Sequence, residues 1–81
     1  STFSTNFHEK MFQEIAKNPQ HSTSVQILQM ASVVAITVED VQNTLNMPED
    51  KAENVLSELL LQGHLTSYEQ SGKTYYKCRE E

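Results

Sequence analysis

The chain has 81 residues, of which 37% are hydrophobic and 21% are charged, and its formal net charge is −5 at pH 7. This length allows one small domain with a modest core, and the composition is that of a globular chain. The acidic balance argues against a protein whose main task is to bind phosphate groups, and the longest apolar run, residues 33–36, is too short to cross a membrane. A single cysteine allows no internal disulfide, which favours an intracellular, reducing compartment.

The first helix is expected over residues 6–18, after a flexible lead-in at residues 1–5. Asn6 and Glu9 have the spacing of a capping box, in which each side chain accepts a hydrogen bond from the other residue's backbone N–H. One helical face then carries residues at i, i+3, i+4 and i+7, namely His8, Met11, Phe12 and Ile15. Pro19 is expected to end this helix.

A second helix is expected to begin within residues 21–24, with Thr23 and Gln26 as a capping pair. Its apolar stripe consists of Ile27, Met30, Ala31 and Val34, broadened by Leu28. The β-branched residues at 33–36 then predict a short extended segment near Ile36.

A third helix is expected to begin after Thr37, which caps it together with Asp40, and its inward residues are Val38, Val41 and Leu45.

The fourth helix has the clearest pattern in the chain. Pro48 fits its first turn, and an apolar stripe follows that consists of Ala52, Val55, Leu56, Leu59 and Leu60. Gly63 is expected to end the helix as a C-terminal cap. Leu61 lies off the stripe, so we expect it either to form a second apolar contact point or to pack under the first helix.

Residues 65–68 and 74–78 are predicted strands, joined by a loop at residues 69–73. Alternation places Tyr75 with Lys77 on one face and Tyr76 with Cys78 on the other, so at least one tyrosine should be exposed. The sequence therefore predicts a fold that is mainly α with a small β-hairpin, in one domain over residues 6–81.

The order helix, extended residue, helix, turn, helix, hairpin resembles a winged helix-turn-helix over residues 24–78, with the wing at about 64–78 and the first helix as an addition. Within it, the run QGHLTS at residues 62–67 resembles the helix-to-wing junction in the C-terminal winged helix of the middle subunit of replication protein A. That family's domain is acidic and docks helical segments of DNA-repair and replication proteins. The resemblance implies a partner-binding surface, and the candidates are Gln62, His64, Thr66, Tyr68 and Tyr75.

Direct DNA reading by the fourth helix is disfavoured. In a DNA-binding winged helix the third core helix, here the fourth of the chain, enters the major groove. Residues 37–63 carry six acids and one base, which would repel a duplex. Residues 64–79 instead have a local charge of +2, so the alternative nucleic-acid site consists of Lys73, Lys77 and Arg79.

No metal, cofactor or catalytic site is expected. His8, His21, His64 and Cys78 lack the close spacing of metal ligands, and the paired acids fit the positive ends of helix dipoles. We therefore do not expect an enzyme.

These features predict a protein-interaction module of an intracellular, nuclear protein that acts in chromatin or in DNA replication, repair or recombination. A basic partner would suit the acidic helices. Winged helices bind DNA, RNA or proteins on nearly the same scaffold, so two alternatives stay open. The first is DNA or nucleosome binding led by the basic wing, and the second is a structural or dimerisation role.

Overall fold

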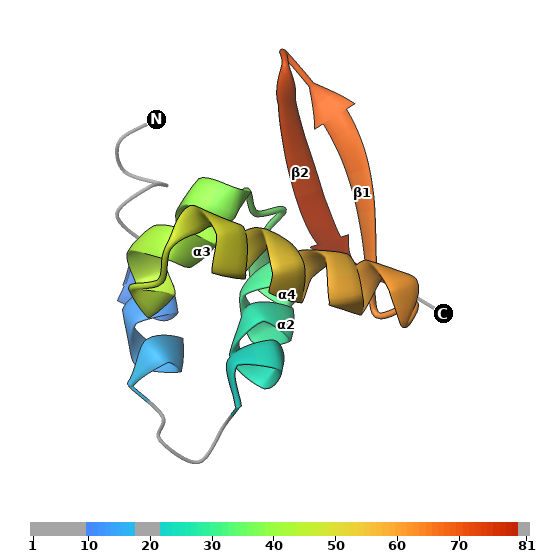
Figure 1. Cartoon of the computed structure of the whole chain (residues 1–81). Helices are drawn as coiled ribbons and strands as arrows, with labels where there is room; N and C mark the ends of the chain where they lie inside the picture. Colours follow the sequence, from blue (N-terminus) through green and yellow to red (C-terminus); the bar gives the residue numbers. More distant parts are fainter. Residues whose placement is uncertain (1–9, 18–21, 80–81) are drawn as a thin grey trace.

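The computed structural model describes residues 10–17 and 22–79. Residues 10–16 are helical, and five elements follow: α2 (Thr23–Val33), α3 (Val38–Leu45), α4 (Glu49–Leu61), β1 (Leu65–Gln70) and β2 (Lys73–Cys78). The helices form one body, and the antiparallel hairpin projects from it (Figure 1). The described chain is thus mainly helical with a small β-hairpin, as the sequence predicts. None of its helices is long and apolar enough to span a bilayer.

The first helix is described from residue 10 onward. Phe12 is buried in the core, and Met11 and Ile15 are half-buried, so the predicted stripe faces inward. The remaining expectations for this region lie outside the described residues: the lead-in at residues 1–5, Asn6, His8, Glu9, Pro19 and His21.

The cap of α2 differs by one residue from the expected one. The Ser22 hydroxyl, and not that of Thr23, accepts a hydrogen bond from the Val25 N–H at 3.3 Å. Ser22 has the extended backbone that an N-cap needs, with ψ at 166°, whereas Thr23 is already helical. The Gln26 side-chain amide donates across to the carbonyls of Ile15 (3.2 Å) and Ala16 (3.4 Å). This contact ties α2 to the end of the first helix, where carbonyls lack helical partners.

The segment between α2 and α3 confirms two predictions. Ile36 is extended and fully buried, and it exchanges two backbone hydrogen bonds with Tyr76 of β2, at 2.8 and 2.7 Å. Thr37 and Asp40 form the predicted capping box, each side chain accepting from the other residue's N–H. The start of α3 is therefore held next to the hairpin.

Helix α4 buries the stripe that the sequence predicts, although Pro48 is its N-cap and lies one residue before the first turn. Gly63 ends the helix with a φ of +85°, a left-handed conformation that glycine adopts without steric cost. The Gly63 N–H donates to the Leu60 carbonyl at 3.0 Å, and the His64 N–H donates to the Leu59 carbonyl at 2.9 Å. This pair of bonds is a Schellman motif, which turns the chain directly into β1.

One hydrophobic core joins all the elements. Among the described residues, ten hydrophobic side chains are buried: Phe12, Ile27, Met30, Ala31, Ile36, Val41, Ala52, Leu56, Leu59 and Leu65. Val38, Leu45, Val55 and Leu60 pack against this core and are half-buried. Tyr76 and Cys78 of β2 also pack against it, so the hairpin is anchored at its base.

The expected five-residue loop at residues 69–73 is wrong. The strands pair from Leu65–Cys78 to Gln70–Lys73, so the turn is only Ser71-Gly72. Both turn residues have positive φ, 53° and 77°, as a type I′ hairpin turn requires. The polar ends of the strands have weak β propensity, but cross-strand hydrogen bonding continues through them because this tight turn sets the register.

Candidate functional site

The hairpin has an inner and an outer face, because residues paired across an antiparallel ladder lie on the same side and successive residues alternate. Leu65, Tyr76 and Cys78 lie on the inner face and pack on the core. The outer face carries the pairs Thr66–Lys77, Tyr68–Tyr75 and Gln70–Lys73. The Arg79 N–H donates to the His64 carbonyl at 3.0 Å, so His64 and Arg79 continue this face beyond the strands.

Two stacked tyrosine rings form the centre of the outer face. The ring centroids of Tyr68 and Tyr75 are 5.5 Å apart, and the ring planes differ by 16°. Tyr68 is 44% exposed, whereas Tyr75 is half-buried. One tyrosine is exposed, as predicted, but it is Tyr68; Tyr75 and Tyr76, on whose alternation the prediction rests, are both half-buried.

The two sets of residues singled out from the sequence interleave on this one face. His64, Thr66, Tyr68 and Tyr75 were expected to bind a protein partner, and they occupy the same outer rows as Lys73, Lys77 and Arg79, which were expected to contact nucleic acid. Gln62 is the C-cap of α4 and lies just before this face begins. From the sequence, the protein-binding set and the nucleic-acid-binding set are two alternatives, but the strand register places them next to each other.

The outer face is positively charged. Within residues 64–79 its charged side chains are Lys73, Lys77 and Arg79, while Glu69 is paired with Thr74 on the inner side. A Cβ added at Gly63 would lie 3.3 Å from Nη1 of Arg79, so this guanidinium rests over the turn that ends α4. A cation there also complements the negative end of the helix dipole.

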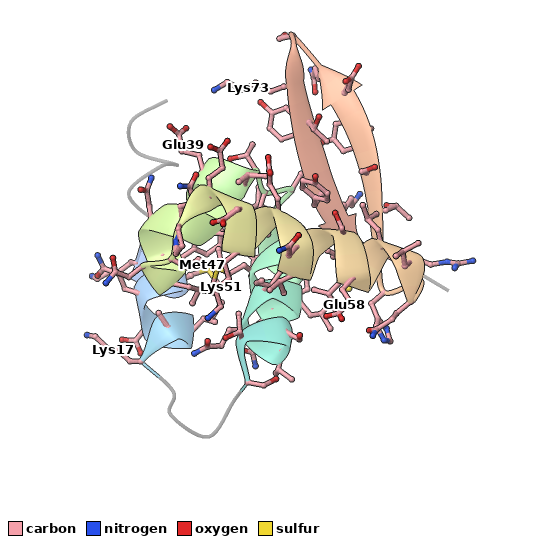
Figure 2. The ribbon with its side chains drawn as sticks, viewed as in Figure 1. Lys17, Glu39, Met47, Lys51, Glu58 and Lys73 are labelled. Carbon is pink, nitrogen blue, oxygen red and sulfur yellow. The ribbon has the colours of Figure 1, made fainter. Side chains whose placement is uncertain are left out.

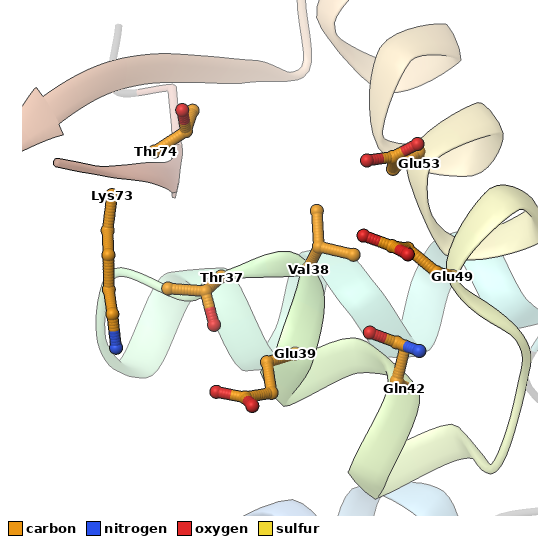
Figure 3. A pocket seen from close by; sticks show the side chains of 8 residues that line it. All are labelled: Thr37, Val38, Glu39, Gln42, Glu49, Glu53, Lys73 and Thr74. Atoms are coloured by element: carbon orange, nitrogen blue, oxygen red, sulfur yellow. The ribbon is translucent and has the colours of Figure 1, made fainter.

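A second feature is a hollow between the two acidic helices and the hairpin. It has a volume of about 340 Å³ and lies between α3, the start of α4 and the start of β2 (Figure 3). Its lining residues are Thr37, Val38, Glu39, Gln42, Glu49, Glu53, Lys73 and Thr74. We call it the acidic hollow, because three of its four charged side chains are glutamates.

Local helix geometry explains why these carboxylates gather. Glu39 and Glu49 are in the first turns of α3 and α4, whose starts border the hollow from two sides. Glu53 follows Glu49 by four residues and therefore lies on the same face of α4. All three side chains are exposed, so water remains their main solvent.

Lys73 borders both the outer face and the acidic hollow. Its register places it opposite Gln70 on the outer face, at the tip of the hairpin. In Figure 3 its side chain extends from β2 alongside Thr37, and Figure 2 shows it across the gap from Glu39. Of the three hairpin cations, Lys73 therefore has the most acidic surroundings.

One glutamate of the acidic hollow, Glu53, also affects a tyrosine on the inner face of the hairpin. Burial raises the pKa of the Tyr76 hydroxyl above its usual 10.0, and the carboxylate of Glu53 raises it further. Both effects disfavour the phenolate, the first by loss of solvation and the second by like-charge repulsion.

In the described part of the chain, no group of three or more His, Cys, Asp or Glu side chains is placed so that it could hold a metal ion. His64 is exposed, and Cys78 is half-buried with its Sγ 3.9 Å from the Arg79 carbonyl oxygen.

Two features were not resolved by sequence reasoning. Sequence reasoning explains Glu39 and Glu49 by helix dipoles and does not join them with Glu53, although acids that open two consecutive helices are the signal that could have joined them. For Leu61 the sequence offers two alternatives, and the structure excludes one of them: the side chain is 88% exposed and therefore does not pack under the first helix.

No family model, curated protein or solved structure that we compared with this chain matches it.

Proposed function

We propose that this chain is a winged-helix interaction module that docks a basic segment of another protein on the surface between its helices and its wing. The element order supports the winged-helix assignment, with the β1–β2 hairpin as the wing. The backbone bridge between Ile36 and Tyr76 supports it further, because it adds a short third extended segment beside the hairpin.

The observation that carries the proposal is the acidic hollow. In a DNA-binding winged helix the third core helix, which corresponds to α4 here, enters the major groove. In this chain the first two turns of α4 present Glu49 and Glu53 there, and Glu39 of α3 lines the same hollow. Duplex binding depends on neutralising phosphates with Lys and Arg, so this surface disfavours DNA and favours a cationic protein segment.

The proposed partner site therefore differs from the one that the sequence suggests, which is on the outer face of the hairpin. A basic segment would meet Lys77 and Arg79 if it lay on the outer face of the hairpin, and like charges there would weaken its binding. The acidic hollow on the helix side of the wing has the complementary charge. We therefore place the basic segment at the hollow. Such a module belongs in a nuclear protein that acts on chromosomes, where basic protein segments are abundant.

The experiment is an affinity measurement with a lysine-rich synthetic peptide, for the wild type and for the triple variant Glu39→Gln/Glu49→Gln/Glu53→Gln. Each exposed charge pair contributes about 0.5 kcal/mol, so we expect about tenfold weaker binding. The control is Glu58→Gln, which removes an exposed acid from the same helix outside the lining of the hollow. Equal weakening by Glu58→Gln would show that net charge alone attracts the peptide, and the proposed site would be wrong.

The outer face favours a second function, contact with the phosphate backbone of DNA or a nucleosome. Its rows carry three cations and no carboxylate within residues 64–79. This contact would leave the glutamates of the acidic hollow free, although Lys73 borders both surfaces.

A further inference from the structure

The outer face of the hairpin combines aromatic rings with cations in one row of alternating positions. Along β2 the order is Lys73, Tyr75, Lys77, and Arg79 follows directly after the strand. Residues two apart in a strand are separated by about 7 Å. Aromatic rings interleaved with cations at this spacing suit a ligand that alternates flat groups and negative charges.

The Tyr68 ring is open to such a ligand. Stacking on Tyr75 occupies one face of the ring, and the other face is turned away from β2. In the described chain β1 pairs with β2 alone, so this second ring face lies at the free edge of the hairpin. The exposed fraction of Tyr68, 44%, agrees with an accessible ring.

We propose that the outer face of the hairpin binds single-stranded nucleic acid, with an unpaired base stacking on the open face of Tyr68, whose other face is supported by Tyr75, and with phosphates contacting Lys77 and Arg79. Every base offers a flat π face, so stacking on tyrosine needs no particular sequence. The proposal extends the second proposed function and is independent of the docking of a basic segment, because it uses the opposite side of the hairpin.

Two other anionic ligands fit less well. A duplex keeps its bases stacked inside the helix, so it could use the cations but not the tyrosine rings. An acidic protein segment could likewise pair with Lys77 and Arg79, but its carboxylates would not stack on the rings. The exposed stacked pair therefore favours unpaired bases.

The acidic body does not prevent this contact. The glutamates of the hollow lie on the helix side of the hairpin, and Glu69 is on its inner face. Exposed charges beyond about 8 Å are largely screened at physiological salt. The positive field of the outer face is therefore local, and binding should weaken steeply as salt rises.

The test is a titration of the protein with a short oligothymidylate, followed by tyrosine fluorescence and by the NMR signals of the tyrosine rings. The chain has three tyrosines and no tryptophan, so its fluorescence reports on the tyrosines alone. We expect quenching and ring shifts at Tyr68 and Tyr75, with smaller changes at Tyr76 on the inner face.

Variants separate stacking from charge. Tyr68→Ala should weaken binding about tenfold or more, whereas Tyr68→Phe keeps the ring and should stay within about twofold. Lys77→Gln should weaken binding about threefold or more and lower the salt dependence, and the matched control Lys51→Gln, on acidic α4, should change it little. Both tyrosine variants alter an exposed side chain outside the core, so the fold should survive, as the unchanged Tyr76 ring signals would verify.

Three results would overturn the proposal. The first is an absence of oligothymidylate binding at low salt. The second is equal affinity for a duplex of the same length with no loss in Tyr68→Ala, which would reduce the site to the backbone contact of the second proposed function. The third is equal affinity for polyglutamate, which would assign the face to acidic protein segments. None of these outcomes changes the lysine-rich peptide measurement, so the two proposals fail separately.

Discussion

The inner face of the hairpin packs against the core and the outer face is turned to solvent, although residues of the two faces alternate along the same two strands. On the inner face Leu65 is 3% exposed, and Tyr76 and Cys78 pack against the core. On the outer face Tyr68 is 44% exposed although Tyr75 stacks on one side of its ring, and Lys77 lies in the adjacent row of the same face. Odd- and even-numbered positions in β1 and β2 therefore have different roles: one set packs on the core, and the other is available to a ligand.

The largest expected effect is on the inner face. Leu65→Ala should lower the free energy of unfolding by about 2–5 kcal/mol, because it removes buried methyl groups and leaves a cavity beneath the hairpin. Its neighbour Thr66 points outward, so Thr66→Ala should stay within about 0.5 kcal/mol of the wild type. Denaturant unfolding measures both. Equal losses of unfolding free energy in the two variants would show that the hairpin does not have a buried and an exposed face in solution.

The turns at the two ends of β1 give the next largest effect. Gly63 and Gly72 have φ of +85° and +77°, so alanine at either position costs about 1–2 kcal/mol of backbone strain. At Gly63 the new Cβ would also lie 3.3 Å from Arg79 Nη1, whereas at Gly72 it would have no neighbour within 4 Å. Thermal unfolding should therefore rank Gly63→Ala as the more destabilising variant. The reverse order would contradict the close contact with Arg79.

A smaller effect is expected from the stacked pair on the outer face. Tyr68→Ala should cost about 0.5–1.5 kcal/mol, and a double-mutant cycle with Tyr75→Ala should show a coupling energy of similar size. Tyr68→Phe should be close to neutral, because the stacked ring remains. A coupling energy near zero would mean that the two rings do not stack in solution.

The smallest effect is a pH dependence on the inner face. The pKa of Tyr76 is raised in the folded state, first by burial and second by Glu53, so folding favours its protonated form. This contribution to stability is fully present below the unfolded pKa of about 10 and is lost as the pH rises through the higher folded value. Unfolding curves measured across alkaline pH should show the loss, and Tyr76→Phe should reduce it. The same slope in the variant would assign the loss to other groups.

Much of the fold could be predicted because its signals are local. The stripes of α2 and α4, the capping box at Thr37 and the stop at Gly63 each depend on a few neighbouring residues. The errors are also local. Two adjacent hydroxyl residues compete for the cap of α2, and the tight turn at Ser71-Gly72 uses a serine at φ 53°, where asparagine or aspartate is the usual signal.

The site was less predictable because it depends on packing and register. Glu39 and Glu53 are fourteen residues apart, and they line one hollow only because α3 and α4 pack against each other, with the start of β2 as its third border. Likewise, a shift of one residue in the β1–β2 register would separate Tyr68 from Tyr75. A single sequence shows each charge but not which charges share a surface.

We expect this chain to bind a basic protein segment on the surface that corresponds to the DNA-contacting surface of DNA-binding winged helices. The most direct test is a residue-resolved NMR titration of the domain with a lysine-rich peptide and, separately, with a DNA duplex at low salt. We expect peptide-induced shifts at Glu39, Glu49 and Glu53 that fade as salt rises, and no duplex-induced shifts in the first turns of α4. Duplex-induced shifts at Glu49 and Glu53, or peptide-induced shifts spread evenly over all acids including Glu58, would contradict it.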